Sequence, residues 1–178
     1  MYSGYIAGNV AREKYGGGGV FVDGTSAKFT MTGGHIIGNL AEDDGGGVYV
    51  RKGGTFTMTG GDITGNSANE EYYKPTDEVV SEGGGVYLDD SNSTFVMDGG
   101  TIKGNCAGSD GGGVRIYDGA TFTMNSGTIT SNDGILGGGV DISHGATFIM
   151  NGGSITSNSV KPDPSPYVLS NSGGGVCV

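Results

Sequence analysis

The chain has 178 residues, 40 of them glycine, and carries 9 basic against 19 acidic side chains, for a formal net charge of -10. This balance argues against a nucleic-acid partner, because neutralising phosphates requires clustered lysine and arginine. The glycines lack the strict Gly-X-Y period of collagen, and no apolar run is long enough to cross a bilayer. We therefore expect neither a triple helix nor direct membrane insertion.

The sequence Gly-Gly-Gly-Val occurs six times and identifies an internal repeat. It begins at positions 17, 45, 83, 111, 137 and 173, with steps of 28, 38, 28, 26 and 36 residues. The two long steps contain insertions, near residues 69–82 and 160–172, which we assign to surface loops of a stacked array. The chain thus forms one repetitive segment, 1–178, with five full repeats and partial repeats at both ends.

Each repeat begins with a short predicted strand directly after the glycines. Apolar residues occupy positions i and i+2 in every copy, as in strand alternation: Val20/Val22, Val48/Val50, Val86/Leu88, Val114/Ile116, Val140/Ile142 and Val176/Val178. The residue between them varies too much for a packed interior, so we expect it to face solvent. These intervening residues are Phe21, Tyr49, Tyr87, Arg115, Asp141 and Cys177.

A second predicted strand carries a phenylalanine and a methionine two residues apart, and a third carries an isoleucine. The pairs are Phe29/Met31, Phe56/Met58, Phe95/Met97, Phe122/Met124 and Phe148/Met150, and the isoleucines are Ile6, Ile36, Ile63, Ile102, Ile129 and Ile155. An asparagine follows the third strand in each copy: Asn9, Asn39, Asn66, Asn105, Asn132 and Asn158. We expect these amides to form a ladder in which neighbours satisfy one another.

Three short strands separated by glycine-rich turns, recurring every 26 to 28 residues, predict one rung of a parallel β-helix. In this all-β fold each strand pairs with its counterparts in the rungs above and below. The chain would form about five to six rungs around a thin core of valine, phenylalanine, methionine and isoleucine. The pattern excludes a helical solenoid.

The tetrapeptides resemble those of a known family. Gly-Gly-Gly-Val followed by FTMN (122–125) or FIMN (148–151) is similar to the paired Gly-Gly-Ala-Ile and Phe-x-x-Asn motifs of polymorphic outer-membrane proteins. In other repeats the last position of the second motif holds Thr32, Thr59 or Asp98. The resemblance implies a pectin-lyase-like, right-handed parallel β-helix, as in autotransporter-like adhesin passengers, and a role at the cell surface. It transfers no functional residue.

The outward file of the first strand is a candidate ligand-binding stripe, formed by Phe21, Tyr49, Tyr87 and Arg115. Sugars and peptides bind such stacked aromatic platforms, and the glycines beside the rings leave them accessible. In the first insertion, Tyr72 and Tyr73 would wall a shallow groove beside this stripe. The alternative, which we favour, is that the aromatic contacts between rungs only stabilise the sheet, or that the inserted loop covers the rings.

A catalytic role depends on one pair of side chains. Polysaccharide lyases and hydrolases need acids, and often a base, that converge on one face. His35 and Asp62 should be rung neighbours, with Lys103 nearby. An exposed histidine beside an aspartate is more often a surface ion pair, so we predict a protein that is not an enzyme and needs no cofactor.

The acidic turns and the cysteines give no predicted site. Asp43/Asp44 and Asp89/Asp90 lie in turns without a recurring calcium-binding motif, so we expect no metal. Cys106 and Cys177 should lie about three rungs apart, which is too far for a disulfide. A link between chains through Cys177 stays open.

Threonines recur at outward positions of the second strand: Thr30, Thr32, Thr55, Thr57, Thr59, Thr94, Thr121, Thr123 and Thr147. Regular threonine rows on a flat β-solenoid can order water and bind ice. Here Lys28, Val96, Asp98 and Ile149 interrupt the rows, so strand propensity explains the threonines better.

We predict a structural and adhesive segment of a larger secreted or cell-surface β-helix protein, which displays its loops and aromatic stripe to a host glycan or protein ligand. Because the sequence starts and stops within a repeat, we expect targeting signals outside it and an extracellular location. Three alternatives stay open: a fibre subunit that self-associates head to tail through open strand edges, a polysaccharide-active enzyme, and an ice-binding protein.

Overall fold

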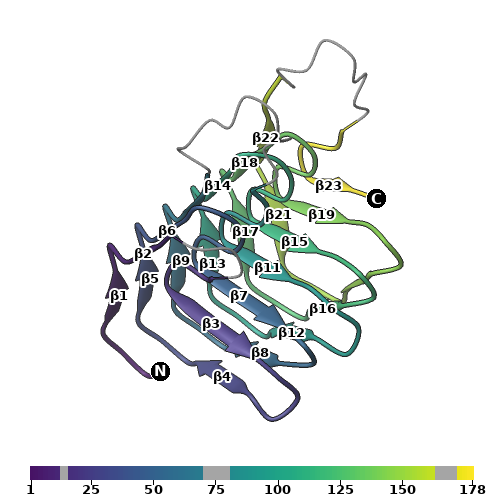
Figure 1. Ribbon diagram of the computed structural model, residues 1–178. Coiled ribbons are helices and arrows are strands. Elements are labelled where there is room, and N and C mark those ends of the chain that lie inside the picture. Colours follow the sequence, from purple (N-terminus) through teal and green to yellow (C-terminus); the bar gives the residue numbers. More distant parts are fainter. Residues whose placement is uncertain (13–15, 70–80, 163–171) are drawn as a thin grey trace.

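The computed structural model describes residues 1–12, 16–69, 81–162 and 172–178. Within these residues the chain winds through 23 short strands that stack into four parallel sheets (Figure 1). The N-terminus lies at one end of the stack and the C-terminus at the other (Figure 1). The predicted all-β parallel β-helix is confirmed.

The first three sheets are those that the repeat columns predict. Sheet 1 holds the strands after the glycines: β3 (Val20–Asp23), β7 (Val48–Arg51), β11 (Val86–Leu88), β15 (Val114–Ile116), β19 (Val140–Ile142) and β23 (Val176–Cys177). Sheet 2 holds β4 (Lys28–Met31), β8 (Thr55–Met58), β12 (Thr94–Met97), β16 (Thr121–Met124) and β20 (Thr147–Met150). Sheet 3 holds β1 (Tyr5–Ala7), β5 (His35–Ile37), β9 (Asp62–Thr64), β13 (Thr101–Lys103), β17 (Thr128–Thr130) and β21 (Ser154–Thr156).

A fourth sheet follows the asparagines and is absent from the sequence prediction of three strands per rung. Its strands are β2 (Val10–Ala11), β6 (Leu40–Ala41), β10 (Ser67–Ala68), β14 (Cys106–Ala107), β18 (Asp133–Gly134) and β22 (Ser159–Val160). Each has only two residues, too few to show the alternation by which a strand is recognised in a sequence.

The interior consists of in-register files of identical or similar side chains. Phe56, Phe95 and Phe122 pair directly across the rungs of sheet 2, and successive rings stack with centroids 4.6 Å apart. These rings are fully buried, as are the isoleucines of the middle rungs of sheet 3. Burying a side chain of this size contributes about 1.5–3 kcal/mol, so each rung gains stability only when its neighbours cover it.

The asparagine ladder is confirmed. The side-chain Nδ2 of Asn66 donates to Oδ1 of Asn105 at 3.0 Å, and Asn105 donates in the same way to Asn132. Each Oδ1 also accepts the backbone N–H of the preceding asparagine, and the second amide hydrogen reaches an isoleucine carbonyl, as from Asn105 to Ile63 O at 3.0 Å. The buried amides therefore satisfy one another from rung to rung.

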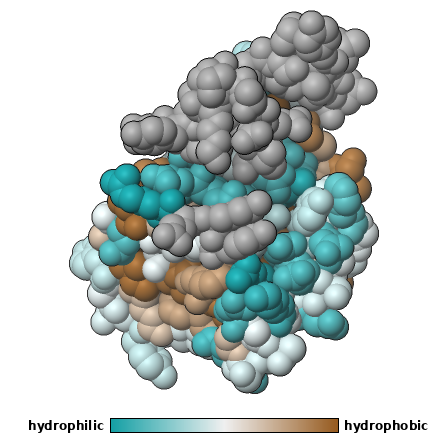
Figure 2. All heavy atoms as spheres, in the orientation of Figure 1, coloured by the Kyte–Doolittle hydropathy of each residue, from teal (hydrophilic) through white to brown (hydrophobic). Residues whose placement is uncertain are grey.

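Among the described residues, the strands of the first and last rungs have a paired strand on only one side in the four sheets. Apolar side chains are partly exposed there, including Val10 and Phe21 at one end and Met150 and Val176 at the other. Figure 2 shows an apolar area at the N-terminal end of the stack, near β3 and β4.

Candidate functional site

The predicted aromatic stripe forms a stacked file on sheet 1, but most of it is buried. The rings of Phe21 and Tyr49 lie 5.4 Å apart and those of Tyr49 and Tyr87 lie 4.9 Å apart, so the rung-to-rung stack is as expected. The expected solvent exposure is wrong for three of its four members: Tyr49 is 1%, Tyr87 5% and Arg115 4% exposed. Only Phe21, in the first rung, is open to solvent, at 41%.

The burial arises because the chain crosses over this file just before it enters the four middle strands of sheet 1, β7, β11, β15 and β19. A Cβ added to Gly45 would lie 2.7 Å from Cβ of Tyr49, and one added to Gly83 would lie 2.6 Å from Cβ of Tyr87. In the four middle rungs, the first glycine of the triplet therefore permits a backbone to pass directly over the side chain four residues later. The triple glycines, which we interpreted as leaving the rings accessible, are the signal that they are covered.

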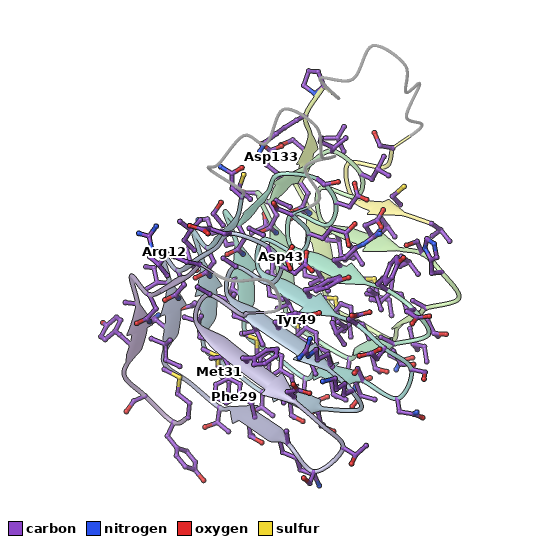
Figure 3. The ribbon with its side chains drawn as sticks, viewed as in Figure 1. Arg12, Phe29, Met31, Asp43, Tyr49 and Asp133 are labelled. Atoms are coloured by element: carbon purple, nitrogen blue, oxygen red, sulfur yellow. The ribbon has the colours of Figure 1, made fainter. Side chains whose placement is uncertain are left out.

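Acidic side chains form hydrogen bonds both with the file and between the covering turns. The hydroxyl of Tyr49 donates to Asp89 Oδ2 at 3.2 Å, and Oδ1 of Asp44 accepts the backbone N–H of Glu82 at 3.1 Å. Tyr49 lies on β7, and the labelled Asp43 lies in the turn before that strand (Figure 3). Both hydrogen bonds thus join neighbouring rungs of the stack on this face.

Arg115 is the centre of a buried ion cluster that sequence reasoning missed. Its Nε and Nη2 donate to the two carboxylate oxygens of Glu82 at 3.1 and 3.2 Å, and its Nη1 contacts Oδ2 of Asp141. Asp110 lies 3.7 Å from Nη2. One guanidinium therefore faces three carboxylates, and each of the four side chains comes from a different rung or turn of the stack.

Burial raises the pKa of two carboxyl groups in this region. It raises the pKa of Asp44 to about 8, with a further contribution from the charge of Asp43. It also raises the pKa of Glu82, against the opposing effect of the Arg115 charge. The rings of Tyr49 and Tyr87 are closed off from solvent. A ligand could therefore stack on them only after the covering turns had moved. Tyr72 and Tyr73, the predicted groove wall, lie outside the described residues.

His35 and Asp62 are rung neighbours, as predicted. They occupy paired positions on β5 and β9, and Nδ1 of His35 lies 3.1 Å from Oδ2 of Asp62. The Tyr5 ring stacks on the other side of His35, with centroids 4.9 Å apart. Lys103 lies on the next strand of the sheet, β13. On that strand Thr101 is paired with Asp62, and Lys103 is two residues after Thr101. Both members of the pair are about two-fifths exposed, so the arrangement is an accessible acid and base on an open sheet face.

Three carboxylates approach one another where two turns meet. One oxygen each from Asp89, Asp90 and Asp118 lie within 4.8 Å of one another. Oxygen ligands of this kind suit calcium, which takes six to eight of them. Both oxygens of Asp89 already accept hydrogen bonds, from Tyr49 and from the backbone of Asp90. The sequence prediction that the chain binds no metal stays a prediction.

The threonines of sheet 2 lie in register. Thr55 pairs with Thr94, and Thr94 with Thr121, along one outward file, and the hydroxyl of Thr94 donates to that of Thr55 at 3.4 Å. Lys28 is paired with Thr55 and Val96 with Thr57, so both residues interrupt the threonine rows, as the sequence indicated. Cys106 and Cys177 are not joined by a disulfide, as the sequence indicated.

Among the described residues, no helix has the length and apolar character needed to span a membrane. A family model described as a right-handed beta helix region matches residues 3–178. Neither a curated protein nor a solved structure matches the chain.

Proposed function

Because the chain belongs to the family of right-handed β-helix proteins, we propose that it is a non-enzymatic structural and adhesive segment of a larger secreted or cell-surface protein. The observation that carries this proposal is the unbroken register of all four sheets, with an apolar interior and an asparagine ladder that continue through every rung. Such a stack is a stiff support, and stiffness is what a protein needs to hold binding loops in fixed positions.

The positions of the two insertions fit this role. The first connects β10 to β11 and the second connects β22 to β23, so both leave sheet 4 and enter sheet 1. Their attachment points lie at one corner of the stack, three rungs apart, so the two loops could contact the same extended ligand. We propose a host glycan or protein as that ligand, with Tyr72 and Tyr73 of the first loop as contact residues.

Deleting residues 70–80 tests the display role. The deletion leaves Asn69 and residues 81–85 between β10 and β11, which matches residues 108–113 between β14 and β15 in number. It also keeps Ser81, which already lies over Ser109 and accepts its backbone N–H at 3.0 Å. We therefore expect the shortened chain to fold with an unchanged far-ultraviolet circular dichroism spectrum.

A glycan and peptide array then compares four proteins: the parent, the 70–80 deletion, a Tyr72→Ala/Tyr73→Ala variant, and a matched deletion of 163–171. The second deletion likewise restores a six-residue connection, between β22 and β23. We expect the parent to bind a member of the array, and the 70–80 deletion and the Tyr72→Ala/Tyr73→Ala variant to lose that binding. A folded 70–80 deletion that binds as the parent does would contradict display by this loop.

A polysaccharide-active enzyme is the second candidate, and the 3.1 Å contact between His35 and Asp62 favours it. General acid–base catalysis needs such a pair within reach of a sugar. Turnover of acidic and neutral glycans that disappears in both His35→Ala and Asp62→Ala would support this candidate. Turnover that survives both substitutions, or none at all with the parent, would count against it.

Head-to-tail self-association stays a prediction, and the strands of the end rungs that are paired on one side support it. Sedimentation velocity at rising protein concentration tests it directly. Species that grow in length with concentration would favour the fibre, and a monomer at all concentrations would count against it.

A further inference from the structure

Cys106 and Lys161 form a close contact that joins distant parts of the chain. Cys106 opens β14 on the outer side of sheet 4, and Lys161 directly follows β22, two strands further along the same sheet. The side-chain Nζ of Lys161 donates to Sγ of Cys106 at 2.8 Å. The backbone places the lysine there, because its N–H donates to the carbonyl of Gly134 at 2.8 Å.

Two more groups fix the ammonium beside the sulfur. The Nζ of Lys161 also donates to the Ala107 carbonyl at 3.4 Å and lies 3.6 Å from Oδ2 of Asp133. Burial opposes the charge of Lys161, but the hydrogen bond to Cys106 and the charges of Cys106 and Asp133 outweigh it and raise the pKa of the lysine. The contact holds the amine nitrogen within reach of the sulfur, and the thiolate is the form of a cysteine that oxidants attack.

We propose that Cys106 and Lys161 are a redox modification site, at which a peroxide converts the contact into a covalent bond between Sγ and Nζ. The thiolate first attacks hydrogen peroxide, which gives a sulfenic acid and hydroxide, and the hydroxide takes a proton from the Lys161 ammonium. The neutral amine then attacks the sulfenic sulfur and displaces its oxygen as water. In total the thiol, the amine and one peroxide yield a sulfenamide and two waters, with the sulfur oxidised by two electrons and the peroxide reduced.

The bond would cross-link sheet 4 over three rungs, because it joins β14 to the residue after β22, with β18 between them. It would also tether the chain immediately before the second insertion. The inference does not depend on the proposed adhesive function, since it follows from the side-chain contact alone.

The test uses the Cys177→Ser chain treated with hydrogen peroxide, quenched with catalase, unfolded and digested with trypsin. Cleavage after Lys103 and Arg115 releases peptide 104–115, which carries Cys106, while Lys161 stays within 116–178 because Pro162 follows it. The substitution is necessary because a disulfide to Cys177 would link the same two peptides. We expect mass spectrometry to find 104–115 joined to 116–178 with a loss of two hydrogens, and dithiothreitol to separate them.

The Lys161→Arg variant in the same background is the matched control. Arginine keeps the positive charge beside the sulfur, so we expect Cys106 to be oxidised and trapped by dimedone as a sulfenic acid, with complete loss of the linked pair. Three results would overturn the proposal: oxidised but unlinked Cys106 in the lysine-containing chain, a linked pair that persists in Lys161→Arg, or a pair that retains a bridging oxygen.

Discussion

The third glycine of each Gly-Gly-Gly-Val sequence has no room for a side chain once another rung covers it. A Cβ on Gly85 would lie 2.5 Å from the carbonyl oxygen of Gly113 and 3.0 Å from Nδ2 of Asn105. The first of these atoms is backbone, so the clash can be relieved only by separating two rungs. The glycine therefore permits the close stacking of adjacent rungs at this corner.

Gly85→Ala should lower the free energy of unfolding by about 1–3 kcal/mol, the usual cost of overfilling a packed interior. Gly175 is the matched control, since a Cβ there would meet only Cγ2 of Ile155, at 3.9 Å. We expect Gly175→Ala to stay within about 1 kcal/mol of the parent in urea denaturation. Equal effects of the two substitutions would contradict the role assigned to rung contact.

Asp44 should make stability depend on pH. Its pKa is about 8 in the folded chain, against an ordinary value of 3.8, mainly because of burial. Between these values the unfolded chain releases a proton that the folded chain retains, so the free energy of unfolding falls as pH rises from about 4 to about 8. Asp44→Asn keeps the oxygen that accepts the Glu82 N–H but cannot ionise.

The Asp44→Asn variant should therefore resemble the parent near pH 4 and exceed its stability by about 1–2 kcal/mol at pH 8, a range reduced for the partial exposure of this carboxylate. Denaturation midpoints measured across this interval supply the comparison. Parallel pH profiles for the two proteins would show that Asp44 titrates in the same way in the folded and unfolded states.

Arg115 should contribute far more to the free energy of unfolding than an exposed arginine in the same fold. Arg115→Met leaves Glu82, Asp110 and Asp141 without their common cation in a buried site, which should cost about 3–5 kcal/mol. Arg12→Met, which removes an exposed pair with Glu42, should cost less than about 1 kcal/mol. If both variants unfolded at the same denaturant concentration as the parent, the buried cluster would have no net stabilising effect.

At the scale of the strand and sheet, the repeat columns predicted what lies inside and which residues pair. Alternation by two positions separates the two faces of a strand, and identical residues at one column, such as Phe56 and Phe95, align when strands stack in parallel. Alternation cannot show what lies over the outer face. Tyr49 and Tyr87 point away from the apolar core and are nevertheless buried, because the turns that begin with Gly45 and Gly83 cover them.

The candidate site was harder to predict than the fold, because alternation along a strand does not show which side chains reach its outer face from other turns. The Glu82 carboxylate reaches Arg115 from the turn before the preceding strand of sheet 1, a distance of 33 positions along the chain. No periodicity links these two residue types, because the cluster occurs in one part of the stack and not in each repeat. The pairing of His35 with Asp62 was predictable, since both occupy the same column of neighbouring copies.

The asparagine ladder predicts that a single substitution affects two rungs. In Asn105→Ala, both the backbone N–H and Nδ2 of Asn66 lose their shared acceptor, and the Ile63 carbonyl loses its donor. Buried groups left without partners cost about 1–3 kcal/mol each before relaxation, so we expect a loss of at least about 2 kcal/mol. Asn125→Ala breaks the exposed contact with Asp98 and should change the free energy of unfolding by less than about 1 kcal/mol.

At the scale of the whole molecule, stability should be the sum of rungs and of the contacts between adjacent rungs. In the part of the chain that the structure describes, every strand pairs only with its counterparts in neighbouring rungs, so removing one complete repeat should bring two compatible surfaces together. Residues 17–44 form such a repeat, and their deletion places Gly45 after Gly16 while keeping the order of the four sheets. The resulting chain should fold as a shorter stack.

We expect the 17–44 deletion to keep the β-type circular dichroism spectrum and a cooperative transition, with a smaller denaturant m-value because less surface is exposed on unfolding. Deleting only residues 17–31 removes β3 and β4 and leads sheet 4 directly into sheet 3, so the rung cannot close. This shorter deletion should abolish the cooperative transition although it removes fewer residues. If the longer deletion were the more damaging of the two, chain length and not rung completeness would govern the stability of the stack.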